Sequence, residues 1–139
     1  MNVIILAGGK GERLKPLTTN VPKPMVLVNK NPILWYIIKQ LKHYGIKKIN
    51  LAIGYKSSVI TNYFKQNFSD HDISFFDQGD VDIIERIKSI VKTKPLEDVL
   101  ILYGDTISDV NIEELMSFSK KNKKHSVLTV WPLQTNFGV

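Results

Sequence analysis

Short apolar runs alternate with helical patterns along the whole chain. The apolar runs predict strands near residues 2–7, 48–54, 72–77, 98–103 and 125–131. Between these runs, apolar residues recur at helical spacing near residues 32–44, 57–67, 81–93 and 111–122. This alternation of strand and helix predicts an α/β domain, with a doubly wound, mostly parallel sheet and helices on both of its faces.

Residues at the ends of the predicted helices support these boundaries. Gly45 is a natural stop for the first helix. Ser57 or Ser58 can cap the second helix and Asn111 or Asp109 the fourth, because short polar side chains accept hydrogen bonds from free N–H groups. The helix boundaries are therefore predicted by end signals as well as by periodicity.

The predicted topology brings two strand ends together. Right-handed crossovers order the first four strands 3-2-1-4 in a Rossmann-like sheet, so that the first and fourth strands are neighbours. Ligands bind at this switch point, beyond the carboxyl ends of the strands. The first strand delivers Gly8 to that edge, and the fourth delivers Gly104 and Asp105. We therefore expect a ligand site there.

The segment after the first strand, Leu6–Pro24, has the composition of a phosphate cradle. It reads LAGGKGERLKPLTTNVPKP. Its three glycines can take positive φ and let a ligand approach the backbone, and successive N–H groups in such a turn can bind an anion. Arg13 offers a planar guanidinium for phosphate oxygens. Lys23 stands between two prolines, which stiffen the chain and push the residue before each of them toward extended backbone.

Two better-known phosphate loops do not fit this segment. A P-loop requires a hydroxyl residue after Gly-Lys, but Gly11 follows Gly9-Lys10. The dinucleotide fingerprint requires a third glycine and an uninterrupted helix, but Leu14 occupies the glycine position and Pro16 interrupts a helix. The segment is therefore a different phosphate cradle or, in the plainer interpretation, a glycine-rich turn with solvated cations.

Composition and charge narrow the function classes. The 139 residues suffice for one domain, and the absence of cysteine excludes a disulfide framework and a Cys-based metal site. No stretch suits a membrane span or a signal peptide, so we expect a cytoplasmic protein without a membrane partner. The net charge of +6 suits polyanion binding. The lysines are scattered, however, except at the end of the last predicted helix, where cations complement the helix dipole. We expect no nucleic-acid partner.

Asp105 is the candidate metal ligand. The residue pattern alone leaves two roles open for it. It can bind Mg²⁺, which prefers one or two carboxylates together with phosphate oxygens, or it can cap the turn before the next helix. His43, His71 and His125 are isolated and show no metal-ligand spacing.

The glycine-rich segment resembles the N-terminal motif of the sugar-1-phosphate nucleotidyltransferases, also called nucleotide-sugar pyrophosphorylases. The family pattern is L-A-G-G-x-G-x-R-L-x-P-L-T, a short spacer, and P-K-P-M or P-K-P-L. The chain matches it at Leu6-Ala7-Gly8-Gly9, Gly11, Arg13-Leu14, Pro16-Leu17-Thr18 and Pro22-Lys23-Pro24-Met25. Leu102-x-Gly104-Asp105 is similar to a second family motif, L-x-G-D, whose aspartate binds the catalytic metal.

This resemblance implies a fold, a reaction and a set of site residues. The fold would be of the nucleotide-diphospho-sugar transferase type. An NTP and a sugar 1-phosphate would react, with Mg²⁺ as cofactor, to give an NDP-sugar and pyrophosphate. The implied catalytic residues are Arg13, which would stabilise the triphosphate, and Lys23, which would bridge the reacting phosphates, while Asp105 would bind Mg²⁺. The implied nucleotide-binding residues are Leu6, Ala7, Gly8, Gly9, Gly11, Gln78 and Gly104.

The chain also departs from the family pattern in two places. Gln78-Gly79-Asp80-Val81-Asp82-Ile83 replaces the G-T-A-G-A-L-like segment that reads the base, so CTP, GTP, UTP and dTTP all stay open. An E-K-P-like motif and a second metal-binding aspartate, both from the family's sugar-binding half, are not found. We therefore expect residues 1–139 to form the nucleotide-binding domain, with poor turnover by itself. A non-catalytic nucleotide-binding module is the alternative function. The oligomeric state stays open, and a homo-oligomer is one of the options.

Overall fold

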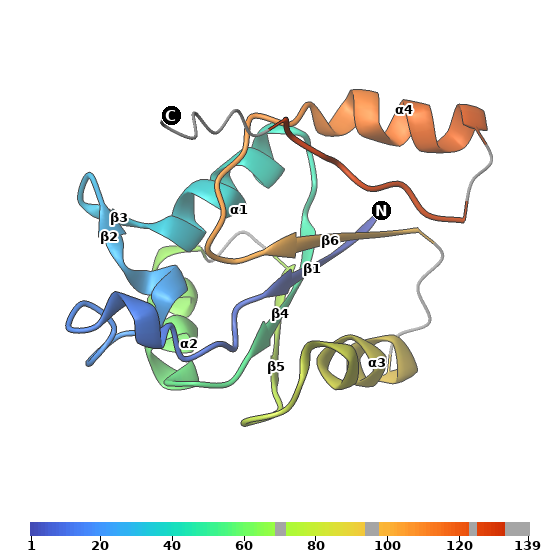
Figure 1. Cartoon of the computed structure of the whole chain (residues 1–139). Coiled ribbons are helices and arrows are strands. Elements are labelled where there is room, and N and C mark those ends of the chain that lie inside the picture. The colour runs from blue at the N-terminus through green and yellow to red at the C-terminus, as the bar shows by residue number, and fades with distance from the viewer. Residues whose placement is uncertain (69–71, 94–97, 123–124, 133–139) are drawn as a thin grey trace, which may run out of the picture. The chain divides into compact units, whose positions relative to one another are not determined.

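A four-stranded parallel sheet forms the centre of the fold. The computed structural model describes residues 1–68, 72–93, 98–122 and 125–132 (Figure 1). The strands are β1 (Asn2–Leu6), β4 (Lys48–Ile53), β5 (Asp72–Asp77) and β6 (Val99–Tyr103). Their order is β5-β4-β1-β6, and all three pairings are parallel. The predicted 3-2-1-4 order is therefore confirmed, with β1 and β6 as neighbours.

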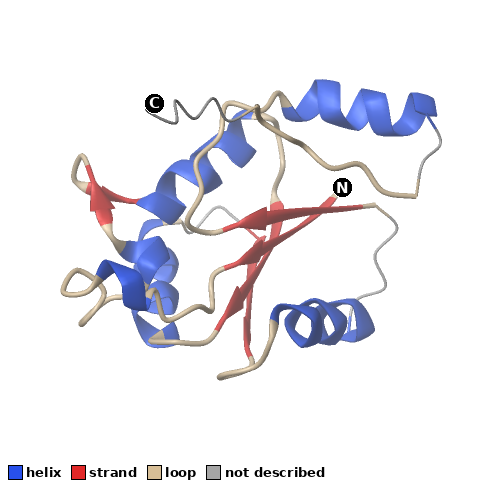
Figure 2. Ribbon diagram, viewed as in Figure 1, coloured by secondary structure: helices blue, strands red, loops and turns tan. Residues whose placement is uncertain are grey.

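Three helices connect these strands and cover both faces of the sheet. They are α1 (Ile33–His43), α2 (Ser57–Asn67) and α3 (Ile83–Thr93), each within two residues of its predicted bounds. Figure 2 shows α3 on the opposite side of the sheet from α1 and α2. Of the five apolar residues at helical spacing in α1, Leu34, Ile37, Ile38 and Leu41 are buried and Ile33 is partly buried.

Strand β1 lies at the centre of the core. Its Val3, Ile4 and Ile5 are fully buried. Because successive side chains in a strand point to opposite faces, Ile4 packs against Ala52 and against Ile90 of α3, while its two neighbours face the other layer. A short continuous apolar run is the expected sequence for such a strand, since both of its faces are covered.

Between β1 and α1 the chain forms small elements that the sequence did not predict. They are the 3₁₀ turns η1 (Glu12–Leu14) and η2 (Lys23–Met25) and the hairpin strands β2 (Leu27–Val28) and β3 (Asn31–Pro32). The expectation of extended backbone at Lys23 was wrong. Pro24 fits in the first turn of η2, where a missing N–H costs no hydrogen bond, and the Met25 N–H closes the turn on the Pro22 carbonyl at 2.8 Å.

The helix ends confirm part of the predicted capping. Gly45, at φ 68°, follows α1, and its N–H donates to the Lys42 carbonyl at 2.9 Å. Neither Ser57 nor Ser58 caps α2, because the N-cap position is Lys56 and no side chain caps it. The Ser57 hydroxyl instead hydrogen-bonds to Asp77 at the end of β5.

Residues Asp109–Val139 form a second compact unit, distinct from the unit Met1–Ser108. This second unit contains α4 (Ile112–Asn122). Asn111 caps it, because its Oδ1 accepts the N–H groups of Glu113 and Glu114 at 3.1 and 3.2 Å. Of the two capping candidates, Asn111 is therefore the one that caps the helix.

The predicted strand at 125–131 was wrong. Residues 125–132 have no regular secondary structure, and Leu128, Val130 and Trp131 are all at least 78% exposed. A strand needs a partner strand for its backbone N–H and C=O groups, and no described strand pairs with this segment.

Candidate functional site

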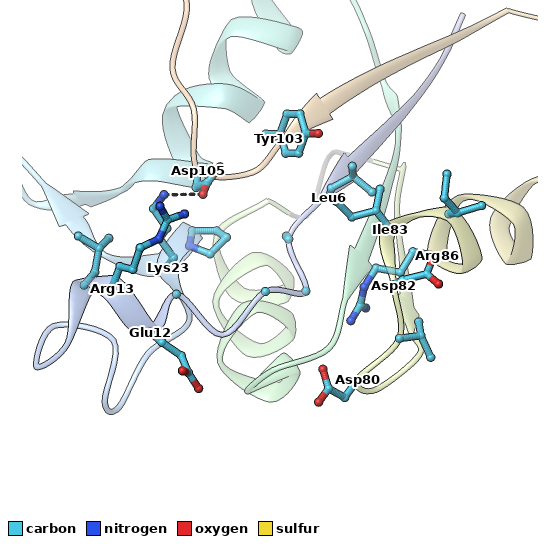
Figure 3. Close-up of a pocket in the computed structure, with 18 residues that line it drawn as sticks. Leu6, Glu12, Arg13, Lys23, Asp80, Asp82, Ile83, Arg86, Tyr103 and Asp105 are labelled. Atoms are coloured by element: carbon cyan, nitrogen blue, oxygen red, sulfur yellow. Dashed lines mark ion pairs between the residues drawn. The ribbon is translucent and has the colours of Figure 1, made fainter.

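A cavity of about 970 Å³ opens where β1 and β6 end, at the switch point of the sheet (Figure 3). Every residue that lines it belongs to the unit Met1–Ser108. The predicted site residues that line it are Leu6, Ala7, Gly8, Gly9, Gly11, Arg13, Lys23 and Asp105. The lining residues that are not among the predicted site residues are Glu12, Leu14, Pro24, Asp80, Val81, Asp82, Ile83, Ile84, Arg86 and Tyr103.

The glycine-rich turn is held in shape by contacts that only glycine permits. Gly11 has φ 64°, and a Cβ there would come within 2.9 Å of the Lys23 Cβ. Thr18, which is fully buried, donates its hydroxyl hydrogen to the Gly11 carbonyl at 2.9 Å. The turn and the Lys23 segment therefore pack directly against each other, although eleven residues separate them in the sequence.

Lys23 and Asp105 meet inside the cavity. The Lys23 Nζ lies 2.6 Å from Asp105 Oδ2, and both side chains are about one-third exposed. Figure 3 shows Arg13 beside this pair, on the same side of the glycine-rich turn. The structure therefore brings together the three charged residues that the sequence motifs singled out, from segments far apart along the chain.

Gly104 sets the position of Asp105 without lining the cavity. Its N–H donates to the Leu6 carbonyl at 2.9 Å, which ties the end of β6 to the end of β1. A Cβ at Gly104 would lie 3.1 Å from both the Ala7 Cβ and the Leu6 carbonyl oxygen. Close approach of these two strand ends therefore favours glycine, and Asp105 follows at once.

Gln78 does not line the cavity. Its side-chain amide donates to the Ser89 hydroxyl of α3, and its Oε1 is buried with no hydrogen-bond partner among the described residues. In place of Gln78, the wall beyond β5 is formed by residues 80–84 and Arg86.

Arg86 is a cation in the cavity lining that sequence reasoning missed entirely. It is only 4% exposed, and its guanidinium donates to the carbonyls of Ile53 at 2.7 Å and Gly79 at 2.6 Å. The sequence carries one signal that could have identified it. Gly8 follows the first predicted strand and Gly54 ends the second, and such small residues at one sheet edge leave room for a large buried side chain.

An exposed ion pair joins the glycine-rich turn to the opposite wall. Lys10 Nζ lies 2.6 Å from Asp80 Oδ2. The hydrogen bond between them raises the pKa of Lys10 and lowers the pKa of Asp80. Because both side chains are well exposed, the pair contributes little to stability, but it links the two walls of the cavity in the absence of ligand.

The donor set around Asp105 fits a magnesium ion only in company with phosphate. Among the described residues, no group of three or more His, Cys, Asp or Glu side chains could hold a metal ion by itself. Mg²⁺ is commonly bound through one or two carboxylates plus substrate phosphates and water. Asp105 beside a phosphate cradle satisfies that preference.

Of the three isolated histidines in the sequence, His71 lies outside the described residues.

These features define a class of protein. A doubly wound parallel sheet, with a glycine-rich turn and cations at its switch point, is the architecture of a Rossmann-like nucleotide-binding protein. The model of the Nucleotidyl transferase family matches residues 2–139. The chain belongs to this family, and its fold is of the nucleotide-diphospho-sugar transferase type. No described helix has the length and apolar character needed to cross a membrane.

Individual relatives agree with this assignment. The glucose-1-phosphate cytidylyltransferase of Salmonella typhimurium is 34% identical over 164 residues, covering 99% of this chain and 63% of the relative. The D-glycero-alpha-D-manno-heptose 1-phosphate guanylyltransferase of Campylobacter jejuni is 37% identical over 119 residues, covering 83% and 52%. The crystal structure of HddC from Yersinia pseudotuberculosis complexed with GMP-PN matches with a TM-score of 0.77 and 27% identity, covering 85% and 53%. The chain thus spans 52% to 63% of the length of these three proteins.

Proposed function

We propose that the protein transfers a nucleotidyl group from an NTP to a sugar 1-phosphate, giving an NDP-sugar and pyrophosphate. The observation that carries this proposal is the meeting of Lys23, Asp105 and Arg13 beside the glycine-rich turn in a single cavity. The family assignment supports it, and both curated relatives are named for nucleotidyl transfer to a sugar 1-phosphate.

The reaction needs positioned charge more than a protein nucleophile. A phosphate oxygen of the sugar 1-phosphate forms a bond to the α-phosphorus of the NTP, and the bond from that phosphorus to the bridging oxygen of pyrophosphate breaks. Two polyanions must be held together against their mutual repulsion, and negative charge builds up on the departing pyrophosphate. Fixed cations and N–H donors aimed at these oxygens lower the barrier because they need no reorganisation during the reaction.

The predicted site residues other than Gln78 each have a role in this scheme. Leu6, Ala7, Gly8 and Gly9 contact the nucleotide, and the backbone at Gly11 turns around the phosphates. Arg13 stabilises the triphosphate and the charge on the leaving pyrophosphate through its planar guanidinium. Lys23 bridges the two reacting phosphates. Gly104 serves as the spacer that brings Asp105 against the turn.

Asp105 would hold Mg²⁺ together with phosphate oxygens. When bound, the metal supplies neutralising charge and helps to orient the phosphates. The Lys23 ammonium satisfies the same carboxylate in the ligand-free protein, so it leaves Asp105 when it moves to a phosphate.

Exchange of labelled pyrophosphate into the NTP tests the proposal. The complete protein would be assayed with CTP, GTP, UTP and dTTP against a panel of sugar 1-phosphates, which also identifies the base and the sugar. Arg13→Ala and Lys23→Ala should each lower the exchange rate by about 100-fold or more, as expected for loss of a group that acts on transition-state charge. Lys88→Ala is the matched control, because Lys88 pairs only with exposed Glu85 on α3.

Two other outcomes point to other functions. Tight nucleotide binding without exchange for any sugar 1-phosphate would contradict the enzyme and favour a nucleotide-binding module. Strongly salt-dependent binding of oligonucleotides, in place of mononucleotides, would contradict both and favour a nucleic-acid partner, which the net charge of +6 makes worth testing.

A further inference from the structure

The guanidinium of Arg86 lies between two glycines from different strand ends. A Cβ built on Gly8 would lie 2.4 Å from Arg86 Nη1, and a Cβ built on Gly54 would lie 2.5 Å from the Gly79 carbonyl oxygen and 2.8 Å from Arg86 Nη2. Real Cβ atoms do not approach other atoms that closely, so neither position can carry a side chain while the guanidinium is there. The turn after β1 and the loop after β4 are therefore both shaped around Arg86.

The hydrogen bonds of Arg86 reach a third strand end. Nη1 donates to the carbonyl of Ile53, the last residue of β4, and Nη2 donates to the carbonyl of Gly79, in the loop after β5. A planar guanidinium holds two carbonyls in fixed directions, whereas the donors of an ammonium rotate on a flexible stem. One side chain from α3 thus joins the glycine-rich turn, the β4 loop and the opposite wall of the cavity.

Arg86 forms no ion pair with a carboxylate in the described part of the chain, although its charge helps to lower the pKa values of Asp77 and Asp80. The hydrogen bonds of its guanidinium go to the carbonyl oxygens of Ile53 and Gly79. A cation that is only 4% exposed and has no carboxylate in direct contact is costly, because burial removes its hydration. Since Arg86 also lines the cavity, an anion bound there would add countercharge to that of Asp77 and Asp80.

We infer that Arg86 is a positioning residue for the nucleotide, which fixes the glycine-rich turn against the Gly79–Asp82 wall and places a buried positive charge behind the phosphate cradle. This inference rests on the proposed function. It adds a cation that none of the sequence motifs contains. In this role Arg86 fixes the conformation of the phosphate cradle through its hydrogen bonds to backbone carbonyls. In Figure 3 Arg86 lies on the opposite side of the turn from Lys23 and Asp105.

Binding measurements on four variants test the inference. Arg86→Met removes the charge and both hydrogen bonds, and Arg86→Lys keeps the charge but does not hold both carbonyls in fixed directions. Lys88→Met removes an exposed charge from the same helix, and Ile90→Val destabilises the core of α3 without touching the cavity. Calorimetry would measure the affinity for the Mg²⁺ complex of the preferred NTP and for inorganic tripolyphosphate.

We expect Arg86→Met to weaken binding of both ligands by about tenfold or more, as for loss of a charged group that also orders the site. Arg86→Lys should recover part of the tripolyphosphate affinity and less of the nucleotide affinity. Both controls should bind within about twofold of the unmodified protein, since neither alters the cavity. Folded Arg86→Met with unchanged affinity, or an equal loss in Ile90→Val, would overturn the inference.

A ligand-free measurement keeps this inference separate from the proposed function. Gly8→Ala should lower the thermal midpoint by about 5 °C, because its Cβ displaces the guanidinium, and should have little further effect in the Arg86→Met background. Equal shifts in both backgrounds would overturn the placement of Arg86. If no NTP binds to the unmodified protein, the proposed function fails and so does the nucleotide role of Arg86. The non-additive change in thermal midpoint between Gly8→Ala and Arg86→Met would still show that Arg86 packs against the turn. Should Arg86→Met not fold, Arg86→Lys provides the second background.

Discussion

The Lys23–Asp105 ion pair places a proposed catalytic cation on a proposed metal ligand. The Lys23 Nζ lies 2.6 Å from Asp105 Oδ2, so a metal ion that bound this carboxylate would compete with the ammonium. Nucleotide phosphates offer Lys23 another anion. We therefore expect metal and nucleotide to bind together, with weak metal binding when nucleotide is absent.

Lys23→Met should raise the affinity for Mn²⁺ in the absence of nucleotide by about fivefold, since a partly exposed ion pair is worth up to roughly 1 kcal/mol. Paramagnetic resonance of free Mn²⁺ would measure this directly, with no need for activity. Lys10→Met is the matched control, because it removes the same charge from an ion pair that does not involve Asp105. An equal gain in Mn²⁺ affinity in Lys10→Met would show that the effect comes from net charge, and it would contradict competition between Lys23 and the metal for Asp105.

The sequence predicted the residues that motifs carry and missed those that tertiary packing selects. Lys23 and Asp105 could be assigned because short motifs with fixed spacing precede or follow strands. Arg86 sits in an amphipathic helix, where an arginine normally indicates a solvent-exposed position. Gly8 and Gly54 at one sheet edge indicate that a buried side chain passes there. The two glycines can be recognised as neighbours only when the order of the strands is known.

At the scale of elements, Asp77 links the end of β5 to the start of α2. The hydrogen bond from Ser57 lowers the pKa of Asp77 below its ordinary value of 3.8, and the N–H of Gly79 lowers it further. A carboxyl with a depressed pKa in the folded state stabilises the protein above its unfolded pKa. That contribution is lost as the pH falls through the lower, folded value.

Asp77→Asn should therefore have a lower free energy of unfolding than the unmodified protein at pH 7. This difference should shrink as the pH falls below about 4, where the carboxyl of the unmodified protein also becomes protonated. Urea unfolding at pH 7, 5 and 3.5 would measure this trend. Ser57→Ala should show the same trend while the carboxylate remains, because it removes the principal donor. A deficit that stays constant across this range would contradict the assigned cause.

Helix α4 provides a test of capping. Asn111 accepts the N–H groups of Glu113 and Glu114, and its side-chain amide donates to the Glu114 carboxylate at 3.0 Å. Asn111→Ala should destabilise the helix by about 1 kcal/mol, and Asn111→Asp should retain most of its stability. Hydrogen exchange of the Ile112–Asn122 amides would measure the stability of α4 in each variant. Asp109→Ala is the control and should change little; an equal effect there would make Asp109 the cap.

The parallel sheet and its helices were predictable because each strand is a short apolar run and each helix has a regular apolar face. The failures have a common origin in partners that the local sequence does not specify. Residues 125–131 carry a strand-like pattern, but no described strand pairs with them. Ser57 has the chemistry of a cap, yet its hydroxyl hydrogen-bonds to Asp77, from a strand that follows it in the chain. Propensity is a weak guide wherever a tertiary partner competes.

At the scale of the whole molecule, the chain divides into the units Met1–Ser108 and Asp109–Val139, and the whole cavity belongs to the first. The cavity is built from segments that follow β1, β5 and β6, and Arg86 and Gly104 tie these segments to neighbouring strand ends. A ligand that holds these segments together should therefore stabilise the sheet as one cooperative body, in addition to ordering the loops.

Saturating Mg²⁺–NTP should then slow hydrogen exchange in β1, β4 and β6 as well as in the glycine-rich turn. At a ligand concentration 100 times the dissociation constant, linkage gives about 2.7 kcal/mol of added protection for amides that exchange only through unfolding of this unit. The corresponding nucleoside, which lacks the phosphates that the cradle holds, should give little protection at the same concentration. Protection confined to the turn, with the strands unchanged, would show that the nucleotide orders a local loop and that the strand ends are not coupled through the site.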